Sequence, residues 1–429
     1  MQSVSASWRH GPAHRVGLSV DRRRRGVRID RLGQLHPRYR PGRRGRLRRH
    51  HGLPRWRHLP KRMRLNVIQD VATPHNNVVL TALKQDPSIE LVLWYCSGKT
   101  AEYSGNEGLT NAVIPSRYYH AATIDWTLIW YALSHPKEKF LLVGWMNPST
   151  KLLFVLWSLL RRPFNMWFDY PQDDSLRSPL KAVLRQTFYR LLKFANCRIF
   201  CVGKMTVDYF RRRGFTEKRL VNLPIFVDLS KRKADYASFK HAIWKKYQLK
   251  NDGFVITAGS RLIRDKGFDL LIEAFHRLPA DFRRRSRCII VGKGPEKIAL
   301  ERLIERYRLT DRVRIVDWMD IEDLKALIAN SDIFVHCARF DAYGGGTLNA
   351  MVVGTPVIGS LNAGSAPDRI EHGRNGYLYK AEDTAALADL LQSALQDRKK
   401  LANMGTCARR TAEKWPPSLS AQIIQGSII

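Results

Sequence analysis

Long apolar runs are absent from this 429-residue sequence, because no stretch reaches the roughly 18 residues that a membrane-spanning helix needs. The six cysteines are scattered among apolar segments, and no second pair joins Cys197 and Cys201 to complete a zinc site. Buried free thiols in a reducing compartment are the favoured interpretation. Acidic residues are scarce, with 38 Asp and Glu against 73 Lys and Arg, so the formal net charge is +35.

That imbalance is greatest in residues 1–62, where about twenty basic residues accompany only two acids, Asp21 and Asp30. The segment has no helical or strand periodicity and could not bury a core. It fits an arm that binds nucleic acid or anionic lipid, or a transit peptide. We favour a third hypothesis, that translation starts at Met63, because a strand pattern follows that methionine at once. An intact mass that includes residue 1 would contradict this hypothesis.

From Met63 onward, short apolar runs alternate with helical segments, which predicts an α/β protein with parallel sheets. The predicted strands are 66–70, 91–95, 140–144, 164–168 and 198–202, followed by 254–258, 288–291, 313–316, 333–336 and 356–358. We expect two Rossmann-like domains, at 63–228 and 253–405, joined by a linker at 229–252. A tail at 406–429 is expected to cross back to the first domain.

Ligands on such sheets bind beyond the carboxyl ends of the strands. In the first domain this rim holds His75, Asn76, Asn77, Trp145, Asn147 and Asp169. Residues of these types are more often turn or capping residues than catalytic ones. The segment 179–195 is amphipathic and basic, so it is either a surface for an anionic membrane or the solvated face of a packed helix.

The stretch 341–358 is the most distinctive of the second domain. Three glycines, Gly344, Gly345 and Gly346, precede a helix that we expect to open at Thr347. Glycines let the backbone approach a ligand closely, and the free N–H groups of a helix start suit phosphate. The alternative is a glycine-rich connection without a ligand.

Three motifs give this half a resemblance to a known family: SRLIRDKGFDLLIEAF at 260–275, IIVGKGPE at 289–296, and the stretch 341–358 with its continuation NAGSAPDRIEHGRNGYLY at 362–379. In order and spacing the chain resembles family 4 of the retaining glycosyltransferases. The resemblance implies a GT-B fold, an α/β architecture of two doubly wound domains facing across a cleft. It also implies that the second domain binds a nucleotide-sugar donor and the first an acceptor. The first half fits more loosely, through its sheet pattern and FNMWFDYP at 164–171.

The resemblance assigns roles to individual residues. Arg261 and Lys266 would bind the donor diphosphate and offset the charge on the leaving nucleotide, with Asp341 as the third catalytic residue. No convincing DxD motif is present, so neither a metal nor another cofactor is expected. The remaining donor-binding candidates are Gly259, Gly292, Gly294, Tyr343, Gly344, Gly345, Gly346, Thr347 and Asn349.

The sequence departs from the family pattern at two positions. Asp341 and Asn349 stand where the family carries two glutamates eight positions apart, so one carboxylate is shorter and the other is an amide. The family's glycine-rich loop after the first strand is replaced by TPHNN at 73–77. The acceptor-side candidates are His75, Asn76, His120 and Asp169.

These observations predict a cytoplasmic enzyme, peripheral on the inner face of the plasma membrane. It would move a hexose of the mannose, rhamnose or glucose type from a GDP- or UDP-sugar to a lipid-linked or glycan acceptor in surface polysaccharide synthesis. An anionic membrane is an expected partner and nucleic acid is not. Three alternatives remain: a sugar-nucleotide epimerase of the same fold, a non-catalytic sugar-nucleotide-binding relative, and a nucleic-acid-binding protein that uses the arginine-rich arm.

Overall fold

The computed structural model describes residues 62–70, 73–97, 116–120, 122–144, 147–171, 179–227, 229, 236–247 and 253–429. The arginine-rich segment predicted at 1–62 lies outside the described residues except for Arg62, and so does part of the predicted linker.

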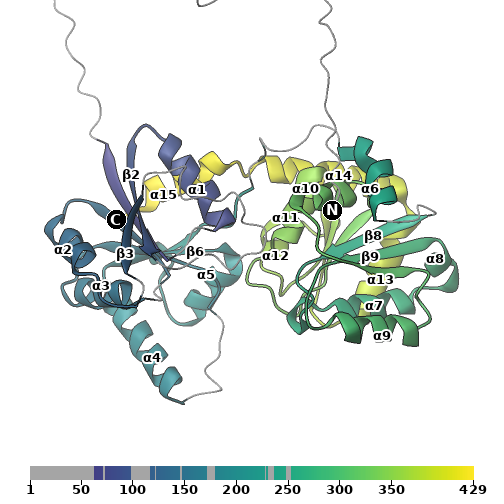
Figure 1. Ribbon diagram of the computed structural model, residues 1–429, viewed down its shortest axis with the longest axis horizontal. Coiled ribbons are helices and arrows are strands. Elements are labelled where there is room, and N and C mark those ends of the chain that lie inside the picture. The colour runs from purple at the N-terminus through teal and green to yellow at the C-terminus, as the bar shows by residue number, and fades with distance from the viewer. Residues whose placement is uncertain are drawn as a thin grey trace, which may run out of the picture. The chain divides into compact units, whose positions relative to one another are not determined.

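Seven parallel strands form the first sheet (Figure 1). They are β1 (Met63–Gln69), β2 (Ile89–Ser97), β3 (Ser116–His120), β4 (Lys139–Val143), β5 (Phe164–Phe168), β6 (Cys197–Cys201) and β7 (Leu220–Asn222). Their order across the sheet is β3-β2-β1-β4-β5-β6-β7. The central strands read as nearly continuous apolar runs because both faces of a parallel sheet are covered.

Helices cover the two faces of this sheet unequally. One face packs on the helices α2 (Trp126–Ser134), α3 (Pro148–Leu159), α4 (Pro179–Phe194) and α5 (Gly203–Arg212). The opposite face packs on α1 (Pro74–Gln85) and on α15 (Pro417–Ser427), which comes from the other end of the chain.

Six parallel strands form the second sheet. They are β8 (Phe254–Gly259), β9 (Ser286–Val291), β10 (Val313–Val316), β11 (Ile333–His336), β12 (Val357–Ser360) and β13 (Gly376–Tyr379), in the order β10-β9-β8-β11-β12-β13. Its helices are α6 (Lys240–Lys246), α7 (Phe268–Arg277), α8 (Ala280–Arg284), α9 (Lys297–Arg306), α10 (Ile321–Ala329), α11 (Gly345–Val353), α12 (Ser365–Arg369), α13 (Thr384–Gln396) and α14 (Arg398–Glu413).

When the strands of each sheet are numbered along the chain, both sheets have the order 3-2-1-4-5-6. The first sheet adds β7 as a seventh strand at its edge. The direction of winding reverses between β1 and β4 in the first sheet and between β8 and β11 in the second. Such switch points are where doubly wound sheets bind ligands. The predicted α/β class with two doubly wound sheets is confirmed, although β3, β7 and β13 were not predicted.

The last helix completes the first sheet's covering. Ala421 and Ile424 of α15 are buried in the core that it shares with α1. At its end, Ile429 and Asn165 exchange two hydrogen bonds of 3.2 Å, from the Ile429 N–H to the Asn165 side-chain oxygen and from the Asn165 amide to the Ile429 carbonyl. Figure 1 shows α15 beside α1. Among the described residues, no helix combines the length and apolarity that crossing a membrane requires.

Candidate active site

Two loops meet at the switch point of the second sheet. Arg339, after β11, donates two hydrogen bonds of 2.7 and 2.6 Å to the carboxylate of Asp269 in α7. The same guanidinium donates to the Arg264 carbonyl at 3.1 Å, and the Phe340 N–H donates to the Asp265 carbonyl at 3.1 Å. The loop after β8 is therefore fastened to the loop after β11 by side-chain and backbone bonds.

This arrangement brings Lys266 against Asp341. The Lys266 Nζ lies 2.7 Å from Asp341 Oδ2, and the side chains are only 10% and 13% exposed. The Nε2 of His336, the last residue of β11, lies 3.2 Å from the same oxygen, and its Nδ1 lies 2.9 Å from the Thr347 hydroxyl. If Nε2 carries the proton, it donates to Asp341 while Nδ1 accepts from Thr347. One carboxylate oxygen is thus held by two donors.

The environment keeps the Asp341 carboxylate ionised. Burial alone would raise its pKa, but the hydrogen bond and charge of His336, together with the charge and hydrogen bond of Lys266, outweigh burial and hold the pKa well below its usual range. A fixed negative charge therefore sits beside the triglycine turn.

The three glycines of the turn differ in whether the surrounding structure requires a glycine at that position. Gly344 adopts a φ of 81°, and a Cβ there would overlap the His336 ring. A Cβ on Gly346 would lie 2.9 Å from the Phe334 ring. At Gly345 the nearest atom to a Cβ would be His75 Cε1, in ordinary contact at 3.8 Å. Only Gly345 therefore has no packing partner that requires glycine.

The helix that follows starts at Gly345, two residues before the predicted start at Thr347. Gly344 occupies the N-cap and provides no side chain to cap it. The first N–H groups of an α-helix have no partner within the helix, and the helix dipole adds partial positive charge there. The start of α11 is consequently suited to an anion.

The other donor-side candidates fall into two groups. Arg261 is exposed and Asn349 is half-buried, and within the described part of the chain neither has a partner, so both are available to a ligand. Gly292 and Gly294 are explained by packing instead, because a Cβ at either would overlap the backbone oxygens of Ser260 or Leu262. Gly259 is also closely packed, with the Val291 carbonyl 3.2 Å from the position of a Cβ.

Tyr343 points away from the other candidates. Its ring is buried in the hydrophobic core of α1 and the first sheet, against Gly203 at the start of α5. Burial raises the pKa of its hydroxyl. Beside it, the Asp368 carboxylate accepts the Lys204 N–H at 2.9 Å and so caps α5, which has no cap of its own. In this conformation Tyr343 contacts the first domain and does not face the triglycine turn.

Of the acceptor-side candidates, His75 lies beside the triglycine turn. It occupies the first turn of α1 beside Gly345; its side chain is open to solvent, yet surrounding protein atoms lower its pKa through desolvation. Asn76 donates to Gln69 at 3.2 Å. Asp169 directly follows β5 and is exposed, although nearby protein raises its pKa by desolvation. His120 ends β3, and its side chain lies outside the described residues.

Sequence reasoning placed Asn147 on the rim of the first sheet but missed the polar cluster that it forms at the switch point with Asp70 and Tyr119. The Asn147 amide, at the N-cap of α3, donates to Asp70 at 2.5 Å and lies 2.9 Å from the Tyr119 hydroxyl, which donates to Asp70 at 3.0 Å. The position of Asn147 directly before Pro148 was the available signal, since it marks a helix start after a strand. His336 was also missed, because it ends an apolar strand and its partners lie in other segments.

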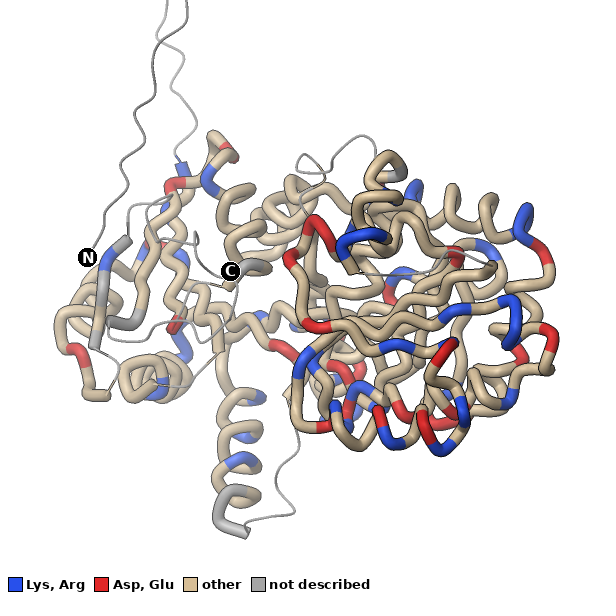
Figure 2. The backbone as a smooth tube through the Cα atoms, turned by 45° about the vertical axis from the view of Figure 1, so that its right-hand side comes forward, with Lys and Arg blue, Asp and Glu red and all other residues tan. Residues whose placement is uncertain are grey.

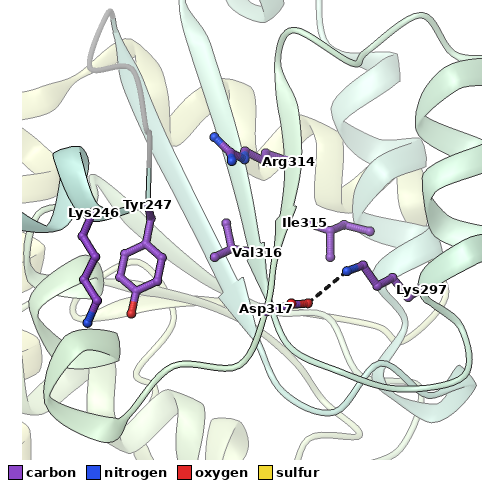
Figure 3. A pocket seen from close by; sticks show the side chains of 7 residues that line it. All are labelled: Lys246, Tyr247, Lys297, Arg314, Ile315, Val316 and Asp317. Carbon is purple, nitrogen blue, oxygen red and sulfur yellow. Dashed lines mark hydrogen bonds and ion pairs between the residues drawn. The ribbon is translucent and has the colours of Figure 1, made fainter. Parts of the chain in front are cut away.

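A pocket of about 260 Å³ lies elsewhere, along the edge strand β10 (Figure 3). Its charged residues are engaged with one another or with neighbours: Lys297 lies 2.9 Å from Asp317, and Lys246 pairs with Asp323. It contains none of the residues of the cluster at Lys266 and Asp341, so it is not the candidate site.

Two parallel sheets of this order, with a glycine-led helix at the switch point of the second, define the GT-B class of α/β fold. A crystal structure of HepE from Anabaena in complex with UDP has the same fold, with a TM-score of 0.66, 18% identity, and coverage of 85% of this chain and 98% of that one. Residues 239–411 match the family model described as glycosyl transferases group 1.

Curated relatives match less than half of the chain. A GDP-mannose-dependent alpha-(1-6)-phosphatidylinositol monomannoside mannosyltransferase of Mycobacterium tuberculosis is 31% identical over 197 residues, 44% of this chain and 49% of its own length. The lipopolysaccharide core biosynthesis glycosyltransferase LpsE of Rhizobium meliloti is 29% identical over 157 residues, 36% of this chain and 44% of its own length. The chain therefore spans less than half the length of either relative.

Proposed function

We propose that this protein is a retaining glycosyltransferase that moves a hexose from a GDP- or UDP-sugar to a lipid-linked or glycan acceptor in cell-surface polysaccharide synthesis. The observation that carries the proposal is the cluster of Lys266, Asp341 and His336 beside the uncapped start of α11, within the part of the chain that matches the glycosyl transferases group 1 model. The relatives' names support the acceptor class: one uses a phosphatidylinositol mannoside and another builds lipopolysaccharide.

In this proposal the donor diphosphate lies at the start of α11. Arg261 and Lys266 donate to its oxygens, and Lys266 keeps one N–H on Asp341 because an ammonium has three. Their charge offsets the negative charge that builds on the leaving nucleotide, the task that a metal ion performs in other transferases. Asp341, fixed by His336, accepts hydrogen bonds from the donor sugar, and its charge favours a positively charged sugar in the transition state.

On the acceptor side, His75 lies across from Gly345, and the leaving phosphate oxygen takes the proton of the attacking hydroxyl. The lipid-linked acceptor places the enzyme at an anionic membrane surface, on the cytoplasmic face where nucleotide sugars are made. Asn349, within α11, binds the ribose hydroxyls through its amide, which both donates and accepts.

Thermal unfolding with GDP, UDP and their sugars tests the donor half of the proposal. A ligand at one hundred times its Kd stabilises the folded state by about 2.7 kcal/mol. We expect one nucleotide to raise the Tm, and the effect to be lost in Lys266→Ala and kept in Arg264→Ala, an exposed arginine two residues away. No stabilisation by any nucleotide would contradict the proposal. Proton NMR of the product's anomeric centre then tests retention.

A further inference from the structure

The outer surface of the first sheet's helices differs from that of an ordinary soluble domain. Helix α3 lies between α2 and α4 and contacts both. All three bury their inner sides in one core, through residues such as Leu128, Leu153 and Leu192. Because they cover the same face of one sheet, their outer sides form a continuous surface, which we call the α2–α4 surface.

Large hydrophobic side chains collect on this surface. Within the part of the chain that the structure describes, ten of the fifteen exposed large hydrophobic residues lie between 124 and 194. They are Ile124, Trp126, Trp130, Leu133, Val155, Leu159, Leu160, Val183, Leu184 and Phe194. The two tryptophans, one helical turn apart on α2, are 67% and 75% exposed. Contiguous exposure of this kind marks a binding surface, since a single exposed residue is ordinary but a cluster is not.

The charge on the three helices is of one sign. The spans of α2, α3 and α4 contain no Asp or Glu, whereas they carry Lys151, Lys181, Arg185, Arg190 and Lys193. Figure 2 shows the basic bands along α4 without an acidic one. Two acids adjoin α2: Asp125 is its N-cap and accepts the Leu128 N–H, and Glu138 accepts a hydrogen bond from the Tyr131 hydroxyl. Apolar and basic residues are interleaved as well, with the Arg161 guanidinium 4.9 Å from the ring centre of Phe194.

We propose that the α2–α4 surface docks on an anionic lipid bilayer, with Trp126 and Trp130 at the boundary between head groups and acyl chains. This inference rests on the proposed function, because docking would bring the enzyme to a lipid-linked acceptor in the bilayer. Its own support is the geometry: apolar outer stripes flanked by Lys and Arg suit helices that lie in the interface plane. Tryptophan prefers that depth, and the anionic leaflet attracts the basic residues.

Vesicle binding by the full chain tests the proposal. Phosphatidylcholine vesicles are compared with vesicles in which about one third of the lipid is phosphatidylglycerol. Because residues 1–62 are rich in arginine and attract anionic vesicles by themselves, the deciding signal is contact with acyl chains. Brominated phosphatidylcholine quenches only tryptophans that reach those chains. We expect quenching in the wild type, its loss in Trp126→Ala/Trp130→Ala, and no change in Trp318→Ala, an exposed tryptophan after β10.

The double tryptophan variant should also partition onto anionic vesicles about tenfold more weakly than the wild type. Lys151→Glu/Arg190→Glu should weaken partitioning as well, whereas Arg302→Glu/Arg306→Glu on α9, an exposed pair on the second sheet's helices, should not. Absence of quenching in the wild type, or equal quenching in the double tryptophan variant, would overturn the proposal. So would a light-scattering mass that falls from dimer to monomer in that variant, because the surface would then be an interface between two copies of the chain.

Nucleotide binding on the same proteins separates this inference from the proposed function. The variants on the α2–α4 surface should be stabilised by the donor nucleotide as the wild type is, because the surface is separate from the Lys266 cluster. Tryptophan quenching without stabilisation by any nucleotide would leave the docking surface standing and remove the transferase proposal.

Discussion

The two sheets share one strand order but differ at their switch points. In the second sheet, an ion pair and a histidine surround a turn that presents an uncapped helix start. In the first, Asp70, Tyr119 and Asn147 form a hydrogen-bonded cluster around a single carboxylate. The cluster of the second sheet suits a charged diphosphate, whereas the cluster of the first sheet suits the hydroxyl groups of a neutral sugar. A shared fold therefore fixes where ligands can bind, and in our proposal the local side chains decide which substrate each half takes.

The helices that cover the two sheets also differ in the charges they carry. Helices on the second sheet such as α7 and α9 mix acidic and basic residues, with pairs such as Glu273 and Arg277 at 2.8 Å. Among the helices of the α2–α4 surface, α3 and α4 carry bases, none of the three carries an acid, and aromatic residues lie in all of them. Mixed charge favours contact with water, and the second pattern favours contact with lipid.

The largest effect is expected from removing one positive charge at the second sheet's site. Lys266→Ala should lower transfer about a hundredfold, since it removes a donor to the leaving diphosphate and leaves Asp341 without its closest partner. Initial rates with saturating acceptor measure the loss, and Arg264→Ala serves as the control. Turnover equal to the wild type would show that Lys266 does not act on the donor.

The next prediction distinguishes a glycine of the triglycine turn that packing requires from one that would allow a ligand to approach. Gly344→Ala should destabilise the protein by about 2 kcal/mol, because the residue has a φ of 81° and a Cβ would overlap His336. Gly345→Ala should leave stability unchanged or slightly improved while weakening donor binding. Urea unfolding and nucleotide titration measure the two properties. Equal loss of stability in both variants would show that the whole turn is structural.

A smaller effect should act on the acceptor alone. Asp70→Asn keeps an oxygen for Asn147 and Tyr119 but removes the charge, so we expect the acceptor KM to rise about tenfold. Donor affinity should stay the same, because Asp70 belongs to the other sheet. Steady-state kinetics with each substrate varied in turn checks this division. A change in donor affinity with no change in acceptor KM would reverse the assignment of the halves.

The smallest effect concerns pH. The pKa of Asp341 is lower in the folded protein than in an unfolded chain, where it is about 3.9. Its ionised form therefore stabilises the fold fully above about pH 4, and this contribution is lost as the pH falls toward the folded pKa. We expect wild type to be more stable than Asp341→Asn by about 1 kcal/mol at pH 7, and the difference to shrink below pH 4. Urea unfolding at several pH values measures it, and a difference that grows in acid would contradict the depressed pKa.

Much of the fold could be predicted because buried parallel strands are short apolar runs, and β8 and β11 end where their residues turn polar. The sequence SRYYH did not suggest an edge strand, since β3 alternates polar and aromatic residues over only five positions. The importance of Lys266 and Asp341 could be read from motif order, but their direct pairing could not, because 75 residues separate them. Gly292 and Gly294 were predicted to bind the donor because a sequence does not distinguish a glycine that packing requires from one that a ligand requires.

Helix α15 makes the first sheet depend on a segment that follows the whole second sheet in sequence. Ala421 and Ile424 fill the core between β1 and α1, so this core closes only when α15 has docked. The second sheet, by contrast, takes all its strands from residues 254–379. Deleting α15 would therefore expose the apolar interior of the first domain to chaperones and proteases while leaving every strand of the second sheet in place.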